Sequence, residues 1–315
     1  VGSEMCIRDR VTLAVHFHER NANGDLVGGP MYYIKNGLKK HWHWLAYLFS
    51  AFGVLTVFGT GNATQVNTIT TAIDSALYNY DIISKESAST LNLILGIVLA
   101  ALIALILLGG IKRIGQVTEK LVPFMAVMYI LLALGVVIVN FKAIPGVFGA
   151  IIEGAFNPSA VTGGVVGTMI VSMQKGVARG IFSNEAGLGS APIAAAAAQT
   201  KEPVRQGLVS MTGTFIDTIV ICTMTGLSIV ITETWNTGLE GVAITTAAFQ
   251  KGLPFPPVVA SFSLMLCLVF FAFTTILGWD YYGERCLEYL FNRNKAAVTT
   301  YRWLYIICVF IGPYM

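Results

Sequence analysis

Long apolar stretches alternate with short polar connections along most of the chain. A helix crosses the hydrocarbon core of a bilayer with about 20 apolar residues, so stretches of this length predict membrane-spanning helices. The pattern predicts spans at 44–73, 91–110, 121–140, 160–198, 207–232 and 257–282. A last apolar run, 303–315, contains only nine consecutive apolar residues before Gly312 and Pro313, and we interpret it as a truncated span.

The span 160–198 differs from the others because its sequence predicts a break. It starts as an apolar helix, passes through a glycine-rich stretch near 175–190 and ends in a run of alanines. One straight helix of this length would extend over about 60 Å, twice the hydrocarbon thickness. The glycines of the break are Gly176, Gly180, Gly187 and Gly189, and its central polar residues are Ser183, Asn184 and Glu185.

Two interpretations of this break are open. Irregular backbone at membrane depth is tolerated where protein buries it or water reaches it, which favours a site for a small polar ligand or ion. The alternative is a cytoplasmic re-entrant loop whose small residues allow close packing. Glu185 favours the first, because an intramembrane carboxylate is costly and commonly functional. Lys175 and Arg179 are candidates to pair with it or to mark the cytoplasmic interface.

Composition agrees with a multi-pass membrane protein. The chain is 55% hydrophobic and 12% charged, with a mean hydropathy of +0.69, whereas soluble domains carry about 25% charged residues. The five cysteines have no paired spacing, which argues against a disulfide framework or a zinc site. The net charge of +3 is spread over loops and does not indicate nucleic-acid binding. No nucleotide-binding or hydrolase motif is present, so we predict neither an enzyme nor ATP-driven transport.

Loop charge predicts the orientation. Thirteen basic residues lie in one alternating set of connections, which we predict to be cytoplasmic, and three lie in the other set. The cytoplasmic set is 19–43, 111–120, 199–206 and 283–302, and the opposite set is 74–90, 141–159 and 233–256.

Polar residues in two other spans are candidates for the same site. Asn62 and Gln65 are three residues apart on one helical face, and their amides both donate and accept; hydrogen bonding between helices is the alternative role. Thr275 and Trp279 are four apart and also share a face. A threonine hydroxyl suits a hard cation such as sodium, but it can equally bond to its own helix, with the Trp in an interfacial belt.

Charged residues near these positions receive structural assignments. Asp217 lies deep in an apolar span. A buried carboxylate could carry a proton or a cation, but we favour a structural partner for the break near 176–189. Asp280, Glu284 and Arg285 are expected to form a salt-linked cytoplasmic cap.

The two ends of the sequence carry separate expectations. Residues 1–10 (VGSEMCIRDR) share no pattern with the rest of the chain and are interpreted as a non-native leader. Val11 to Phe17 resemble the end of a longer helix, so we treat 11–315 as one incomplete transmembrane domain.

Several long stretches resemble the alanine/glycine:cation symporter family, also called sodium:alanine symporters. They are GGPMYYIKNGL (28–38), GGIKRIGQVTEKLVPFMAVMYI (109–130), KGVARGIFSNEAGLGSAPIAAAAA (175–198), FIDTIVICTMTGL (215–227) and FAFTTILGWDYYGERCLEYLFN (271–292). The resemblance implies an all-α LeuT-type fold with a five-plus-five inverted repeat. It also implies a multi-pass protein of the plasma membrane, the bacterial inner membrane.

The resemblance also assigns roles. Phe182, Ser183 and Asn184 are expected to approach the amino acid at the break, and Thr275 and Trp279 to line the pocket. Asn62 and Gln65 are expected to contribute from the third core helix, and Thr274 or Thr275 to bind sodium. Independently of the resemblance, the residues at the break and in the neighbouring apolar span are assigned to structure and coupling: Glu185, Asp217, Gly180, Gly187 and Gly189.

One part of the family pattern is missing from the sequence. The first core helix of the family, with its unwound Gly-Thr-Gly-Asn signature, is expected before residue 11. Residues 59–62 repeat those letters in the surroundings of the third core helix, so the role of the signature is not transferred to them.

The expected function is symport of alanine or glycine with sodium or protons by alternating access, in a lipid bilayer and without an organic cofactor. The alternatives are an inactive fragment or a non-coupled, channel-like membrane protein. A membrane enzyme with Glu185 and Asp217 as an acid pair is a third class, but no nucleophile and base accompany that pair.

Overall fold

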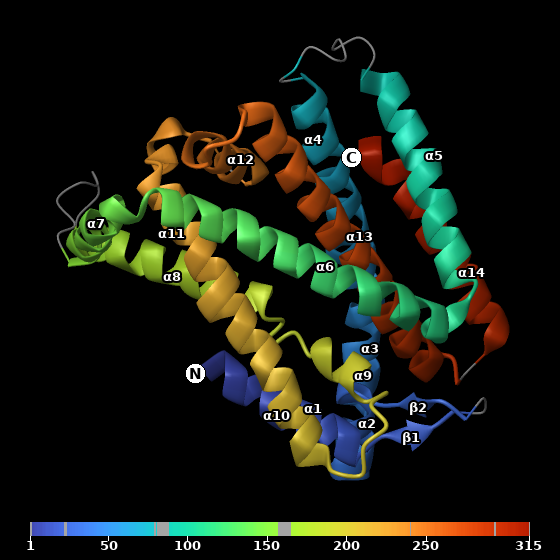
Figure 1. Cartoon of the computed structure of the whole chain (residues 1–315). Coiled ribbons are helices and arrows are strands. Elements are labelled where there is room, and N and C mark those ends of the chain that lie inside the picture. Colours follow the sequence, from blue (N-terminus) through green and yellow to red (C-terminus); the bar gives the residue numbers. More distant parts are fainter. Residues whose placement is uncertain are drawn as a thin grey trace.

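The computed structural model describes residues 2–21, 24–78, 80, 88–156, 165–239, 241–292 and 294–314. These residues form a helical bundle with one small β-hairpin (Figure 1). The longer helices are α1 (Gly2–His16), α3 (Trp44–Thr56), α4 (Thr64–Tyr78), α5 (Ala88–Leu107), α6 (Gly110–Val139), α7 (Ile144–Phe156), α8 (Val165–Ser183), α10 (Pro203–Phe215), α11 (Thr223–Ile231), α12 (Val242–Gly252), α13 (Pro257–Leu290) and α14 (Lys295–Ile311).

Short elements connect and interrupt these helices. The hairpin pairs β1 (Glu19–Arg20) with β2 (Leu26–Val27) in antiparallel register. Two seven-residue π-helical segments, η2 (Val57–Ala63) and η6 (Ile216–Cys222), join α3 to α4 and α10 to α11 without ending either helix. The remaining short helices are α2 (Pro30–Gly37), α9 (Ala191–Ala195), η1 (Lys40–Trp42), η4 (Phe141–Ala143), η7 (Thr234–Thr237) and η8 (Gly312–Tyr314).

Among the described residues, six helical stretches are long and apolar enough to cross a membrane. They are Lys40–Leu77, Ser89–Leu107, Arg113–Val139, Pro203–Ile231, Pro257–Leu290 and Lys295–Tyr314. Five of them contain or closely follow predicted spans. The multi-pass, all-α class is therefore confirmed, and the LeuT-type repeat stays a prediction.

The other two predicted spans differ in detail. The run at 303–315, expected to be too short, belongs to a helix that begins at Lys295 because Asn294 caps it, its side chain accepting from the Ala296 N–H at 2.9 Å; Met315 lies outside the described residues. The segment 160–198 forms α8 and the short α9, with residues 160–164 outside the described ranges. α8 is not among the six, since Lys175 and Arg179 interrupt its apolar character.

The main hydrophobic core surrounds α13. The α13 helix packs against α3, η2, α4 and α14, and the side chains buried between them include Val57, Ile276, Trp279 and Tyr305. Gly61 allows a close approach of η2 to α13, because a Cβ on it would overlap the Trp279 side chain. Tyr305 then ties three elements together, donating to the carbonyls of Ile276 at 2.8 Å and Gly61 at 3.4 Å.

α1 is one continuous helix through the predicted end of the leader. Ile7, Val11 and Val15 are buried and pack against Ala186 near the break. Close contact with α10 is possible because a Cβ on Gly207 would overlap the Thr12 hydroxyl. Residue 10 is therefore not a structural boundary, while a non-native origin for residues 1–10 stays a prediction.

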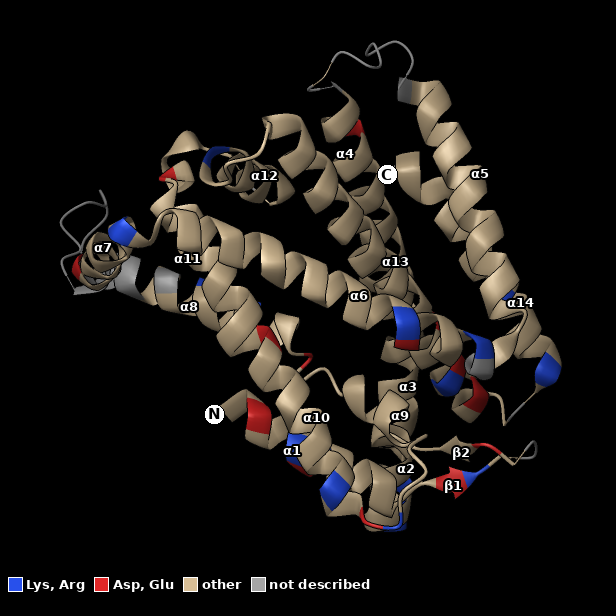
Figure 2. Cartoon of the chain, in the orientation of Figure 1, with Lys and Arg blue, Asp and Glu red and all other residues tan. Residues whose placement is uncertain are grey.

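Charged residues gather at one end of the bundle (Figure 2). The described parts of the four basic connections lie along the lower and right edges in Figure 1, near the hairpin, α2, the start of α6 and the α13–α14 turn. α7 and α12, from the opposite set, lie at the other end. This arrangement suits the predicted orientation, because each set of loops has its own side.

We expect Gly61→Ala to lower the free energy of unfolding by about 1–3 kcal/mol, because overpacking forces α13 away from η2. Gly59→Ala is the matched control, since nothing lies within 4 Å of a Cβ there. It should be neutral, or stabilising by up to about 1 kcal/mol through lower backbone entropy. Denaturation in mixed detergent micelles measures both variants. Equal effects would contradict the close packing of Gly61 on Trp279.

Candidate functional site

The break lies between Ser183, where α8 ends, and Ala191, where α9 begins. Three residues in it have positive φ: Glu185 (52°), Gly187 (120°) and Gly189 (82°). Gly189 also lies against the Phe49 ring, so both its conformation and its packing require glycine. Glu185 has no such freedom, and a left-handed glutamate is held by its surroundings.

One side of the break is linked to η6 by side-chain hydrogen bonds. The Ser183 hydroxyl donates to the Asp217 carboxylate at 2.5 Å. Asn184 and Thr218 bond reciprocally, at 2.8 Å and 3.0 Å. Asp217 thus partners a side chain at the break, rather than backbone groups. Ser183 and Thr218 are exposed, so other groups can reach this pair of bonds.

The other side of the break faces α13. The Ser190 hydroxyl donates to Glu185 at 2.7 Å, and Tyr282 is within hydrogen-bonding reach of the same carboxylate. Ser190 is the residue before α9, but its side chain bonds to Glu185 and does not cap that helix. Through these contacts with Ser190 and Tyr282, Glu185 links the break to α13, which supports a structural role.

A cavity of about 190 Å³ lies beside this contact, between α3, the break and α13. Trp279, Tyr282, Leu188 and Ser190 are among its lining residues. Its walls are mainly apolar with a few polar groups, which is typical of small-ligand sites. Phe182, predicted to approach a ligand, is 49% exposed on α8 and does not line this cavity.

The two predicted threonines bond to their own helix. Thr275 donates to the Phe271 carbonyl at 2.7 Å, which is the helix-bonded alternative raised by the sequence. Thr274 donates to the Phe270 and Phe271 carbonyls and lies near Met125 of α6. Their hydroxyl oxygens keep a lone pair for another donor or a cation.

The two predicted amides are not at the break. Asn62 is fully buried and donates to the Tyr305 carbonyl of α14 at 3.0 Å. Gln65 donates to Thr60 within its own helix at 3.3 Å. In this conformation the Gln65 amide bonds within its own helix, and the Asn62 amide makes the hydrogen bond between helices that was its alternative role.

Sequence reasoning missed Tyr282 and Thr218. Tyr282 is three residues after Trp279, so the two lie on neighbouring faces of α13 and their rings pack at 5.6 Å. Thr218 directly follows Asp217. The helical spacing from Trp279 could have pointed to Tyr282, and the position next to Asp217 could have pointed to Thr218.

The expected salt-linked cap on α13 is different in the structure. Glu284 pairs with Arg302 of α14, and Arg285 pairs with Glu288 at 2.8 Å. Asp280 is fully buried and neither of its oxygens has a hydrogen-bond partner among the described residues. The prediction was wrong because α14 packs on this face and supplies the arginine.

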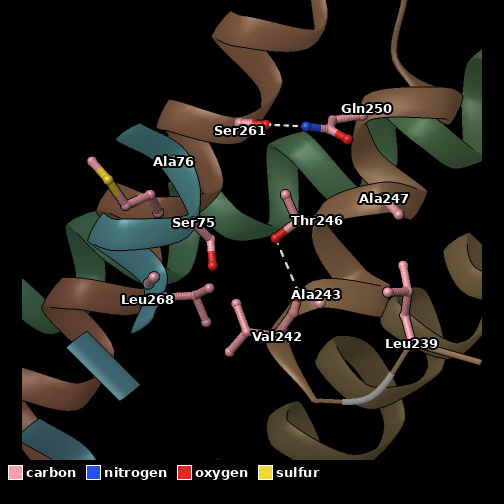
Figure 3. Close-up of a pocket in the computed structure, with 12 residues that line it drawn as sticks. Ser75, Ala76, Leu239, Val242, Ala243, Thr246, Ala247, Gln250, Ser261 and Leu268 are labelled. Atoms are coloured by element: carbon pink, nitrogen blue, oxygen red, sulfur yellow. Dashed lines mark hydrogen bonds between the residues drawn. The ribbon is translucent and has the colours of Figure 1, made fainter. Parts of the chain in front are cut away.

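A second, larger cavity of about 420 Å³ lies between α4, α12 and the start of α13 (Figure 3). At its edge Gln250 donates to Ser261 at 2.5 Å, and Ser75 and Thr246 supply further hydroxyls. None of the predicted site residues lines it. In the part of the chain that the structure describes, no group of three or more His, Cys, Asp or Glu is placed to hold a metal ion.

Comparison with known proteins is consistent with this architecture. The model of the "Sodium:alanine symporter family" matches residues 8–315. The chain is 48% identical to an uncharacterized transporter of Haemophilus influenzae, over 96% of this chain and 63% of that protein. It is 44% identical to the sodium/alanine symporter AgcS of Methanococcus maripaludis, over 95% of this chain and 63% of the relative.

A third relative is the probable sodium/glutamine symporter GlnT of Bacillus subtilis, 37% identical over 92% of this chain and 57% of the relative. The chain thus spans less than two thirds of the length of these curated relatives.

We expect a double-mutant cycle of Ser183→Ala and Asp217→Ala to show a coupling of about 1 kcal/mol in the free energy of unfolding, since the two side chains share a hydrogen bond. Ser183→Ala with Thr212→Ala is the control cycle, because the Thr212 hydroxyl is exposed and donates to the Val209 carbonyl of its own helix. That cycle should be additive within about 0.5 kcal/mol. Additivity in both would show that the break and η6 are not coupled.

Proposed function

Because the chain belongs to the sodium:alanine symporter family, whose members are secondary transporters and not enzymes, we propose that the full-length protein imports alanine or glycine together with sodium. The observation that carries the proposal is the break at 184–190, with polar groups on both of its sides. We further propose that the membrane is the bacterial inner membrane, with the four basic connections in the cytoplasm.

The chemistry at the break suits a zwitterion. An amino acid brings a cationic ammonium and an anionic carboxylate, so its site needs both acceptors and donors. Asp217 offers carboxylate oxygens, while Ser183 and Asn184 offer donors once their present bonds to η6 are exchanged. Because Ser183 and Thr218 are exposed, a ligand can reach these groups.

The mainly apolar lining of the neighbouring cavity favours a small apolar side chain. Trp279 supplies an aromatic wall, and the mainly apolar lining suits a methyl group better than the amide of a glutamine side chain, which would lose its hydrogen bonds there. AgcS is named as a sodium/alanine symporter and GlnT as a probable sodium/glutamine symporter, so the names of the relatives give more than one substrate. Alanine and glycine are therefore proposed over glutamine because of this cavity.

Sodium is proposed as the coupling ion, with Thr274 and Thr275 as candidate ligands. Sodium prefers oxygen ligands, and both hydroxyls retain lone pairs after donating to backbone carbonyls. Protons remain the alternative coupling ion. No resident cofactor is proposed, since the ion is cargo.

Transport would proceed by alternating access. The break separates α8 from α9, so the two helices can tilt independently around Glu185 and the glycines. Coupling requires that the amino acid and the ion together favour the closed state over the open one. A channel would need polar rings along a pore, whereas Ser183 and Asn184 lie within one helical turn.

The proposal predicts saturable alanine uptake by the full-length protein in liposomes, dependent on an inward sodium gradient. Unlabelled glycine should compete better than glutamine, because the mainly apolar cavity offers few partners for the glutamine amide. Radiolabelled uptake with sodium, and with choline in its place, measures this. Equal uptake in both salts, or ion conductance unrelated to alanine, would contradict sodium-coupled symport.

Thr275→Ala and Trp279→Ala should each reduce alanine uptake about tenfold or more, which corresponds to a loss of about 1.4 kcal/mol of binding. Thr299→Ala is the matched control. It removes the same kind of helix bond, from Thr299 to Lys295, at an exposed position of α14. Initial rates at equal protein levels give the comparison. Similar losses in all three variants would show that the α13 face is wrongly assigned.

A further inference from the structure

A buried charge imbalance lies where α13 packs against α14. Asp280 is fully buried, Glu284 is 4% exposed, and Arg302 approaches from α14. Arg302 is committed to Glu284, with one bond from Nε and a second from Nη2 at 2.9 Å. Such a two-bond pair neutralises both partners. Asp280 is therefore left without a counter-charge in the group.

Neither oxygen of Asp280 has a hydrogen-bond partner among the described residues. The Tyr301 hydroxyl, also buried and without a partner, lies against Gly283, where a Cβ would collide with it. The Asp280 carboxylate and the Tyr301 hydroxyl are thus two buried polar groups without hydrogen-bond partners among the described residues, in an otherwise apolar interface. An ionised carboxylate in such surroundings is very costly, whereas the neutral acid is tolerated.

Among the described residues, the charged groups that act on Asp280 are Glu284 and Arg302. Of the titratable groups on α13 and α14, Tyr301 and Tyr305 lie near Asp280, while Cys286 lies near Tyr301 and Cys308 near Tyr305. The core cluster around this part of α13 includes Val57 of η2, and Val54 of α3 and Ile114 and Val117 of α6 pack against it. On α6, Arg113, Glu119 and Lys120 are exposed.

We propose that Asp280 is a proton-binding site at the α13–α14 interface, neutral in this conformation, with Arg302 as the counter-ion it gains when it ionises. The proton comes from water at the end of the bundle predicted to be cytoplasmic, and binding forms an O–H bond on the carboxylate. Release requires Arg302 to leave Glu284 or water to enter between the helices. The proton concentration on that side therefore biases how tightly α14 packs on α13.

This proposal is independent of amino-acid symport, so the test reads Asp280 directly. Infrared spectra of the purified chain, with its aspartates isotopically labelled at the carboxyl carbon, report the carbonyl stretch of a protonated aspartic acid. At neutral pH we expect this band in the wild type and its loss in Asp280→Asn. Glu284→Gln should also lose it, because Arg302 then becomes free to pair with an ionised Asp280.

The outcomes that overturn the proposal are distinct. A wild type without the band, or a band that persists in Asp280→Asn, means that Asp280 is ionised. A band that disappears at constant pH when sodium replaces N-methylglucamine means that the site takes sodium in place of a proton. The wild-type measurements in both salts remain decisive where a variant fails to fold.

Thermal unfolding gives a second readout whose sign separates the possibilities. In the folded chain Asp280 keeps its proton at neutral pH, whereas an aspartate of the unfolded chain, with a pKa of about 3.9, has lost it. Its stability must therefore fall as pH rises. Asp280→Asn keeps the neutral form, so its Tm should be higher than that of the wild type at alkaline pH and depend less on pH. A lower Tm at every pH is the result expected for a broken ion pair, and it would overturn the proposal.

Discussion

The contact of the Trp279 side chain with the backbone of Gly61 sets how closely α13 lies against η2. Because no side chain separates them, Tyr305 of α14 can reach carbonyls on both elements. The same approach presents Tyr282 to the break and leaves the cavity between α3 and α13 small. The geometry of the candidate site thus follows from one glycine that is distant from it in sequence.

The break depends on hydrogen-bond partners for the backbone and polar side chains of residues 183–190. Backbone groups at membrane depth need partners within the protein, and the amides after α8 find them in short turns, such as Ala186 N–H to the Ile181 carbonyl at 3.1 Å. Side chains complete the connection, with Ser183 and Asn184 bonded to η6 and Glu185 bonded to Ser190. Polar residues therefore hold the bend in place, and the same residues are the ones a ligand would have to engage.

Hydropathy and length predicted the helices well, because burial in lipid imposes long apolar stretches wherever the partner helices lie. The break was also predictable, since its glycines and its length exclude one straight helix. Contacts between helices were not. Asn62 and Gln65 share a face by α-helical spacing, but the wide turn of η2 shifts that face, and Asn62 bonds to α14. The cap on α13 failed for a related reason, because spacing along one helix does not reveal that Arg302 arrives from another.

The two π-helical segments have a consequence for insertions and deletions. A π turn holds about one residue more than an α turn, so deleting one residue from η2 or η6 could restore a regular α-helix. Because the π turn spreads one revolution over more residues, removing its extra residue leaves the helix beyond it facing almost the same way. A one-residue deletion in the α-helical part of the span would instead rotate everything beyond it by about 100°. In α10 this would turn Asp217 and Thr218 away from the break while leaving the apolar length of the span almost unchanged. Single-residue deletions are therefore expected to be tolerated within the π-helical segments and not in the α-helical turns before them, where side-chain direction is the constraint.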